Sequence, residues 1–172
     1  LVEADIVLSA TGASEPIVAE RQKELLAAGV TGPEGHYLSR PPKVEAEGVH
    51  HLMTFAELTG ARIYIVHTSC VEALREAVAA RLRGVDVAVE TLIQYLLLDR
   101  TYAERGGFEA SKFVMSPPLR DASNQAVLWD ALRTGLVQTV ATDHAPFDFE
   151  AQKPMGLHDF TKIPNGIPSL EE

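Results

Sequence analysis

The stretch Leu136-Val-Gln-Thr-Val-Ala-Thr-Asp-His-Ala-Pro-Phe147 is a short apolar strand that ends in a carboxylate, Asp143, and an imidazole, His144, before a proline stops it. A second strand, Arg62-Ile-Tyr-Ile-Val-His67-Thr-Ser, also ends in a histidine. Parallel strands place their carboxyl ends at one edge of a sheet, and imidazole and carboxylate are ordinary zinc ligands. The two stretches therefore predict a metal-dependent hydrolytic site at that edge, where Asp143 could also act as a general base.

Each candidate residue also has an ordinary structural explanation. His67 could simply form a hydrogen bond at the end of its strand. Asp143 could cap a helix or join a salt bridge, because an unpaired buried charge is costly. His144 could orient Asp143 or only pack against its neighbours. Ser116 and Asn165 lie in loops rich in proline and glycine, where they could contact a polar substrate or only shape a turn.

The composition excludes several classes of protein. The chain has 172 residues, 46% of them hydrophobic, which is enough for one packed core. Its net charge of −9 disfavours a nucleic-acid partner, and no apolar run approaches the ~20 residues that cross a bilayer. The single cysteine, Cys70, excludes an internal disulfide and fits a reducing, cytoplasmic setting as a packed thiol. The start at Leu1, without a methionine, predicts a piece of a larger protein.

Apolar strands alternate with amphipathic helices along the chain. We expect helices over 16–28, 44–59, 69–83 and 124–134, strands over 4–8, 62–67, 86–90, 112–115 and 136–141, and a loop over 31–42. Ser69-Cys-Val-Glu72 matches a capping box, and Ser123 is a candidate N-cap. This alternation predicts an α/β fold with a parallel sheet, either doubly wound or part of a (β/α)₈ barrel. No strand is followed by Gly-x-Gly-x-x-Gly, so dinucleotide binding loses support. A whole barrel needs about 250 residues, so the chain would supply about half of one.

Several segments together resemble the D-hydantoinase/dihydropyrimidinase family of cyclic amidohydrolases, in the amidohydrolase superfamily. They follow one another in the order and spacing of that family and cover essentially the whole chain. The segments are Thr31-Gly-Pro-Glu-Gly-His-Tyr-Leu-Ser-Arg-Pro-Pro42, Tyr64-Ile-Val-His-Thr-Ser-Cys70, Gln94-Tyr-Leu-Leu-Leu-Asp99, Val114-Met-Ser-Pro-Pro-Leu-Arg120, Gln138-Thr-Val-Ala-Thr-Asp-His-Ala-Pro-Phe147 and Asp159-Phe-Thr-Lys-Ile-Pro-Asn-Gly166.

The resemblance implies a partial (β/α)₈ TIM barrel, about strands 5 to 8, that forms one partial catalytic domain over residues 1–172. It implies a two-metal centre, usually Zn²⁺, that hydrolyses a small cyclic ureide to an N-carbamoyl amino acid, in a homo-oligomer (dimer or tetramer). By this resemblance His67 is a metal ligand, and Asp143 is both a metal ligand and the catalytic base. Ser116 and Asn165 match positions whose backbone groups bind the substrate. The other metal ligands would lie upstream of Leu1.

One position departs from the family pattern. The family has a metal-binding histidine on the fifth strand, and a count without gaps places Thr11 there. A neutral hydroxyl is a poor zinc ligand, so one metal would bind weakly. Two further motifs, Glu90-Thr-Leu-Ile-Gln-Tyr95 and Asp143-His-Ala-Pro146, are also altered, with expected effects on packing. The sequence thus supports an enzyme, inactive as these 172 residues alone, or a dihydropyrimidinase-like scaffold or assembly protein that Thr11 favours.

Overall fold

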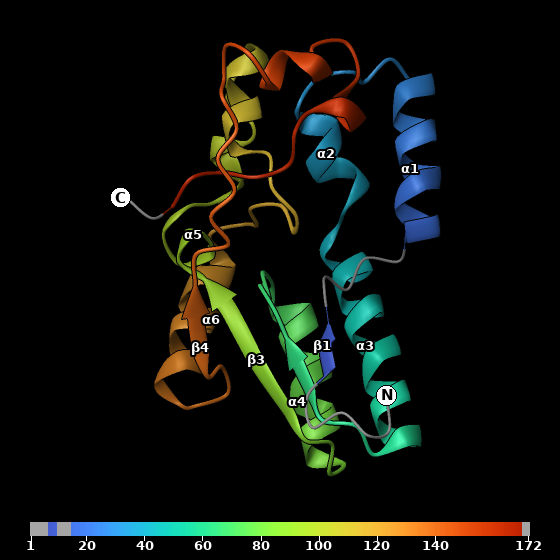
Figure 1. Ribbon diagram of the computed structural model, residues 1–172, viewed down its shortest axis with the longest axis vertical. Coiled ribbons are helices and arrows are strands. Elements are labelled where there is room, and N and C mark those ends of the chain that lie inside the picture. The colour runs from blue at the N-terminus through green and yellow to red at the C-terminus, as the bar shows by residue number, and fades with distance from the viewer. Residues whose placement is uncertain (1–6, 10–14, 170–172) are drawn as a thin grey trace.

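The computed structural model describes residues 7–9 and 15–169 of the chain. Four parallel strands form one sheet, and they stand side by side in their order along the chain (Figure 1). The strands are β1 (Val7–Ser9), β2 (Ile63–Ile65), β3 (Val87–Leu92) and β4 (Thr139–Ala141). A doubly wound sheet reverses its strand order at one point, whereas a barrel wall keeps it. The order therefore favours part of a barrel over the doubly wound alternative.

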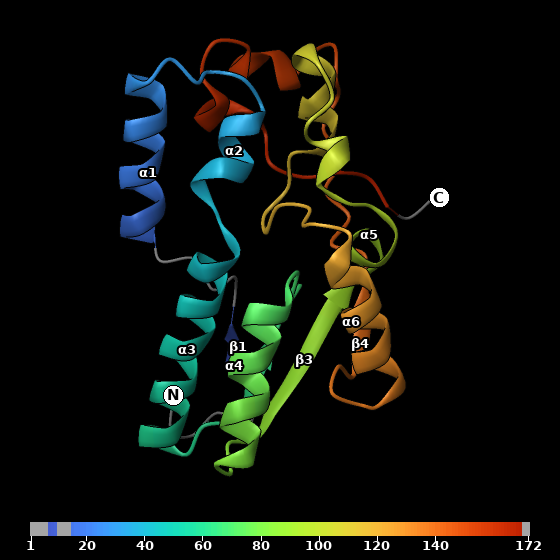
Figure 2. The ribbon, with the colours of Figure 1, turned by 180° about the vertical axis from the view of Figure 1, so that it is seen from behind.

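The helices lie between successive strands along the chain, and some of them cover one face of the sheet. They are α1 (Glu15–Ala27), α2 (Glu34–Ser39), α3 (Pro42–Thr59), α4 (Val71–Leu82), α5 (Ile93–Leu97) and α6 (Ser123–Arg133). Short 3₁₀ helices lie at Arg100–Tyr102, Gly107–Phe113, Lys153–Gly156 and Phe160–Lys162. Figure 2 shows α4 and α6 on the near side of the sheet, with β3 visible between them, and α1 and α2 beyond the strands, so the face of the sheet away from α4 and α6 is the one seen in Figure 1.

Side-chain alternation along the strands explains which face is covered. In β2 the side chains of Ile63 and Ile65 are buried, whereas that of Tyr64 between them is half-buried. Val87 and Val89 of β3 follow the same pattern and join Ile63 and Ile65 in a core with residues of α3 and α4. Successive side chains of a strand point to opposite faces, so the apolar set meets the helices and the remaining set faces away from them.

The sheet has an open edge on each side among the described residues, because β1 pairs only with β2 and β4 only with β3. Val140, at the centre of β4, is 47% exposed. No helix among the described residues combines the length and the hydropathy that crossing a bilayer requires.

The expected elements are confirmed in most of the chain, and two are wrong. The expected loop at 31–42 contains α2, and the expected strand at 112–115 is instead the end of a 3₁₀ helix, Gly107–Phe113. The α2 segment is helical because it packs against a distant part of the chain, since Gly35 lies against the ring of Phe160. Local sequence contains no sign of that contact.

Both expected helix caps are also wrong. Cys70, not Ser69, is the N-cap residue of α4, and its own side chain makes no capping hydrogen bond. The side chain of Asn124 caps this helix end instead, because its Oδ1 accepts from the Val71 backbone N–H at 2.9 Å. The Ser69 hydroxyl instead donates a hydrogen bond to Glu45. Ser123 is the first residue of α6, and its backbone N–H donates to the carboxylate of Asp121 at 3.0 Å. The carboxylate of Asp121, rather than the hydroxyl of Ser123, therefore accepts a hydrogen bond from the N-terminus of α6.

Replacing Gly35 by alanine is expected to destabilise the protein by about 1–3 kcal/mol, the range for an overpacked core. The added Cβ would overlap the ring of Phe160, which is fully buried. Denaturant unfolding of Gly35→Ala measures the change. Gly106→Ala is the matched control, because its Cβ meets nothing within 4 Å and its backbone φ of −59° suits any residue. Equal stabilities of the two variants would contradict this account of α2.

Candidate functional site

His67 and Asp143 share one backbone geometry. Each lies two residues beyond the end of a strand, His67 after Ile65 of β2 and Asp143 after Ala141 of β4. Their φ angles are 41° and 43°, and among the described residues they are the only non-glycine residues with a positive φ. Such a conformation costs about 1–3 kcal/mol and persists where the surrounding structure enforces it, often at functional sites. The structure therefore singles out the same two residues as the sequence does.

A row of polar side chains supports the turn at His67. Glu90 of β3 accepts a hydrogen bond from the His67 backbone N–H at 3.1 Å and another from the Tyr64 hydroxyl at 2.6 Å. The Tyr64 hydroxyl also lies 2.6 Å from the hydroxyl oxygen of Thr139 on β4. Burial, and then the hydrogen bond to Glu90, raises the pKa of Tyr64. The row crosses three strands on the face away from the helices, and it fixes the backbone from which the His67 ring projects.

The turn at Asp143 is held through the residue before it. The Thr142 carbonyl accepts hydrogen bonds from the Gln94 side-chain amide and, at 2.7 Å, from the Ser169 hydroxyl. The Ser169 backbone N–H donates to His144 Nδ1 at 3.0 Å. His144 is exposed, and the donor to its Nδ1 belongs to the segment that follows Asn165. Its expected role in orienting Asp143 stays a prediction.

The metal-binding atoms of both residues are available. His67 Nδ1 is buried and has no hydrogen-bond partner. Asp143 is exposed, and its carboxylate has no partner among the described residues. The expectation that Asp143 is a buried carboxylate in need of a cap or salt bridge is therefore wrong, because the residue is exposed in this part of the protein.

These donor types suit zinc, which takes imidazole nitrogen and carboxylate oxygen, but a site needs three or four ligands. Over residues 7–9 and 15–169 no group of three or more His, Cys, Asp and Glu side chains is placed to hold a metal. No hydrogen bond joins His67 to Asp143 in that part of the chain, and β3 lies between their two strands. The chain therefore fits a metal only as the provider of some of its ligands. Thr11, the position of the missing family ligand, lies outside the described residues.

Ser116 and Asn165 are brought together from positions 49 residues apart, since Asn165 Nδ2 donates to Ser116 Oγ at 2.8 Å. Both line a cavity of about 270 Å³, which Arg40, Glu45 and Arg120 also line. The cavity could hold a small polar molecule. Asn165 is exposed, and its backbone N–H and C=O have no partner among the described residues.

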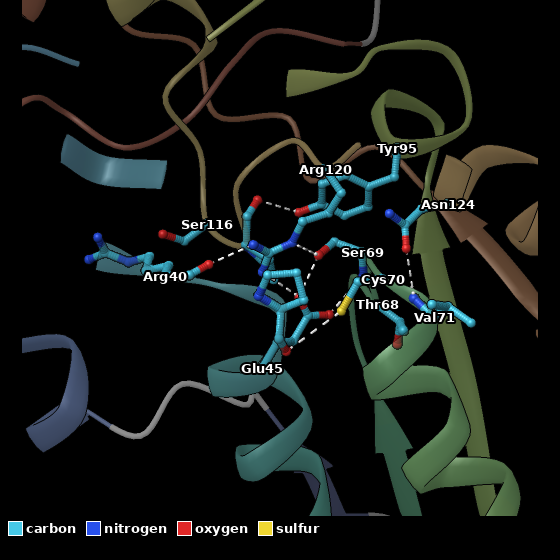
Figure 3. Close-up of polar contacts among 12 residues, drawn as sticks. Arg40, Glu45, Thr68, Ser69, Cys70, Val71, Tyr95, Ser116, Arg120 and Asn124 are labelled. Carbon is cyan, nitrogen blue, oxygen red and sulfur yellow. Dashed lines mark hydrogen bonds and ion pairs between the residues drawn. The ribbon is translucent and has the colours of Figure 1, made fainter. Parts of the chain in front are cut away.

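A buried ion pair between Arg120 and Glu45 lines this cavity, and Figure 3 shows its contacts. Arg120 Nη2 donates to Glu45 Oε2 at 2.8 Å, and the two side chains are 3% and 6% exposed. Arg120 also donates to Ser69 Oγ at 2.9 Å and to the Arg40 carbonyl at 2.6 Å. Burial opposes the charge on Arg120, but the adjacent Glu45 raises its pKa above the ordinary value. The pair ties the loop that carries Ser116 to the first turn of α3.

Cys70 lies beside the ion pair and is fully buried. Burial, and then the negative charge of Glu45, raises the pKa of its thiol well above the ordinary value. The thiol is therefore not a nucleophile, and the prediction of a packed thiol is confirmed. Leu92, in the altered segment Glu90–Tyr95, is likewise fully buried, in a core with Tyr95 and Leu128. The expected effect of that alteration on packing stays a prediction.

His36 is part of the site, and the sequence did not reveal it. The ring lies in α2, and its Nε2 is 2.8 Å from the Met115 carbonyl and 3.3 Å from Ser116 Oγ. Burial, and then the positive charge of Arg40, lowers the pKa of His36 to about 3. The neutral ring donates from Nε2 to Met115, and Nδ1 accepts from Arg40 at 3.3 Å. Met115 and Ser116 lie about 80 residues away from His36 in the sequence, so no local pattern could predict its place in the site.

The chain is similar to curated and solved hydantoinases. A D-hydantoinase of Geobacillus stearothermophilus is 46% identical over 150 residues, which are 87% of this chain and 32% of that enzyme. A dihydropyrimidinase of Arabidopsis thaliana is 44% identical over 156 residues, 90% of this chain and 29% of that enzyme. The structure titled D-hydantoinase (dihydropyrimidinase) from Thermus sp. has 55% identity and a TM-score of 0.93, covering 96% of this chain and 36% of that one.

The chain spans about a third of the length of these relatives. No family model matches it. The resemblance to the D-hydantoinase/dihydropyrimidinase family is confirmed over that third. The solved neighbours are barrel enzymes, so the parallel sheet is part of such a fold rather than a doubly wound domain.

Acid is expected to destabilise the protein through His36. The unfolded chain binds a proton at this histidine near pH 6.5, but the folded chain binds it only near pH 3. The contribution of neutral His36 to the free energy of unfolding is therefore fully present above pH 6.5. It is lost as the pH falls from 6.5 towards 3, by about 1.4 kcal/mol per pH unit. Denaturant unfolding at pH 7 and pH 5 measures the loss.

His36→Gln keeps an N–H donor for Met115 and should remove about 2 kcal/mol of the difference between the free energies of unfolding at the two pH values. His51→Gln, at an exposed histidine, should leave the difference unchanged, and the same slope in all three proteins would contradict the assignment.

Proposed function

We propose that this chain is part of a cyclic amidohydrolase of the hydantoinase/dihydropyrimidinase type. The reaction opens the cyclic amide of a hydantoin or dihydropyrimidine by hydrolysis and gives an N-carbamoyl amino acid. One observation carries the proposal: His67 and Asp143 have matching left-handed turns at two strand ends of a chain that is 46% identical to a D-hydantoinase. A protein that needed the residues only for its fold would have no reason to keep this strained backbone at both.

In this proposal β1 to β4 are about strands 5 to 8 of a (β/α)₈ barrel, and residues 1–172 form one partial catalytic domain. The rest of the barrel comes from sequence outside these residues, since the relatives are about three times as long. The 172 residues alone are then inactive. We expect the whole protein to be cytoplasmic, as the composition and the single cysteine indicate, and a homo-oligomer, dimer or tetramer, as the family resemblance implies.

Hydantoinases are metal-dependent, and the donors of this chain fit part of a zinc centre. His67, through its imidazole, and Asp143, through its carboxylate, would hold the metal together with ligands from elsewhere in the protein. When bound, the metal supplies a Lewis acid that polarises the substrate carbonyl and acidifies water.

The residues of this chain bind the ring and move the proton. The backbone groups of Ser116 and Asn165 bind the cyclic amide beside the cavity that they line. The Asp143 carboxylate takes a proton from the water that attacks the carbonyl carbon. It then delivers that proton to the ring nitrogen as the C–N bond breaks. The product keeps the new carboxylate and the carbamoyl nitrogen in one open chain.

A second function, a catalytically impaired scaffold or assembly protein, is supported by Thr11. A hydroxyl at the position of a family metal ligand would weaken one metal site, and a scaffold tolerates that loss. The free carboxylate of Asp143 and the paired Ser116 and Asn165 favour the enzyme, because a scaffold does not require them. Hydrolysis of dihydrouracil by the whole protein separates the two functions.

Asp143→Asn in the whole protein is expected to lower the hydrolysis rate by about 10²–10⁴-fold, the usual contribution of a general base. Folded stability without metal should not fall, because asparagine accommodates a left-handed backbone. Hydrolysis of dihydrouracil and thermal unfolding measure the two effects. Asp148→Asn is the matched control on the same loop, because an amide oxygen can still accept from the Ala151 N–H. Full activity of Asp143→Asn would rule out the proposed base.

Thr11→His is expected to increase the amount of metal that the whole protein holds tightly, from below two equivalents per subunit towards two. An imidazole at this position would restore the ligand that a hydroxyl replaces poorly. Metal analysis after dialysis against a weak chelator measures the change. Two tightly held equivalents in the unaltered protein would contradict the assignment of Thr11.

A further inference from the structure

Lys153 is a buried lysine with no ion-pair partner among the described residues. It is 2% exposed and begins the short 3₁₀ helix Lys153–Gly156. Burying an ammonium group is costly unless it is hydrogen-bonded, and burial lowers the pKa of Lys153 to about 8. The compensating contacts are hydrogen bonds from Nζ to the carbonyls of Pro164, at 2.6 Å, and of Gly166, at 2.9 Å. The ring centroid of Phe147 lies 5.5 Å from Nζ.

The two carbonyls that Lys153 binds lie on either side of Asn165. The Gly166 N–H donates to the Val114 carbonyl at 2.9 Å, which ties the same segment to the loop that carries Ser116. The backbone N–H and C=O of Asn165 itself have no partner in the described part of the chain. The surrounding contacts therefore hold Asn165 from both sides and leave its own polar groups open to a ligand in the cavity.

The same contacts change the hydrogen-bonding strength of those groups. The Pro164 carbonyl and the Asn165 N–H belong to one peptide unit, so a cationic donor on the carbonyl makes the N–H a stronger donor. The Asn165 carbonyl and the Gly166 N–H belong to the next unit, and donation to Val114 makes that carbonyl a stronger acceptor. Asn165 thus presents an adjacent donor and acceptor, which complements the N–H and C=O of a cyclic amide.

We propose that Lys153 is a positioning residue, which holds the Pro164–Gly166 backbone so that the Asn165 N–H and C=O bind the amide of the ring. It acts through Asn165 and does not touch the substrate. This inference rests on the proposed function, because it assumes that a cyclic ureide enters the cavity beside Ser116 and Asn165.

The test compares Lys153→Met with the unaltered whole protein in hydrolysis of dihydrouracil. Methionine matches the length of lysine but cannot donate. We expect KM to rise about 10-fold while kcat changes less than about 3-fold and the metal content stays the same, since ring binding is lost equally in ground and transition states. Lys153→Gln keeps an N–H donor and should recover part of the loss. Lys112→Met is the matched control, because Lys112 is exposed and its ammonium group donates to Glu109 and lies 4.0 Å from the ring centroid of Phe149, whereas no hydrogen bond joins it to Pro164–Gly166 among the described residues.

A second readout does not depend on activity. Amide hydrogen exchange of Gly166 should accelerate at least about 10-fold in Lys153→Met, and in Lys153→Gln to a smaller extent, while Lys112→Met leaves it unchanged.

If Lys153→Met does not fold, the same two measurements on Lys153→Gln decide between the outcomes. An unaltered KM, or equal loss of kcat and metal, overturns the proposal. If the unaltered protein opens no cyclic ureide, the proposed function fails and the substrate part of this inference fails with it. The exchange rates then decide whether Lys153 holds Asn165, and unchanged Gly166 exchange in Lys153→Met refutes that as well.

Discussion

The ion pair between Glu45 and Arg120 determines how the loops above the sheet are placed. Two buried charges lose their hydration, and their attraction compensates for this loss only with good geometry and further hydrogen bonds. Those bonds are present, because Ser69 and the Arg40 carbonyl take up the remaining donors and acceptors of the pair. Removing either charge would leave the other buried alone, at a cost of about 3–5 kcal/mol. The pair therefore makes the position of the Ser116 loop depend on α3 and on the turn after β2.

The strained turns carry the residues that are expected to react, and the polar contacts around them stabilise these turns. His67 and Asp143 lie in a backbone conformation that is unfavourable by itself, and Glu90 and Gln94 stabilise it from the neighbouring strand and helix. His36 stabilises the other half of the site through Met115 and Ser116. The residues expected to react are thus exposed or unpaired, whereas the residues that hold them are buried or half-buried and form hydrogen bonds to the backbone or side chains of the site.

Periodicity was sufficient to predict the strands of the sheet and the long helices, because each depends on an apolar face that recurs within a few residues, but it also predicted a strand at 112–115 that is absent. Strand ends pointed to His67 and Asp143, which share an unusual backbone conformation in the structure, and their roles as metal ligands stay predictions. The contacts that complete the site could not be predicted in this way, since Glu45 meets Arg120 across 75 residues and His36 meets Ser116 across 80. The capping box at Ser69 failed for the same reason. A local motif indicates what a hydroxyl can do, and here a distant carboxylate provided a stronger partner.

The open edges of β1 and β4 bear on how such a chain behaves when it is made alone. Each edge presents unpaired backbone N–H and C=O groups that any extended segment can match. In a whole barrel these edges meet other strands of the same polypeptide, so closure is intramolecular and independent of protein concentration. In an isolated chain the same groups can pair with a second copy, and aggregation then competes with folding as the concentration rises. The net charge of −9 opposes that pairing, and added salt would weaken the opposition.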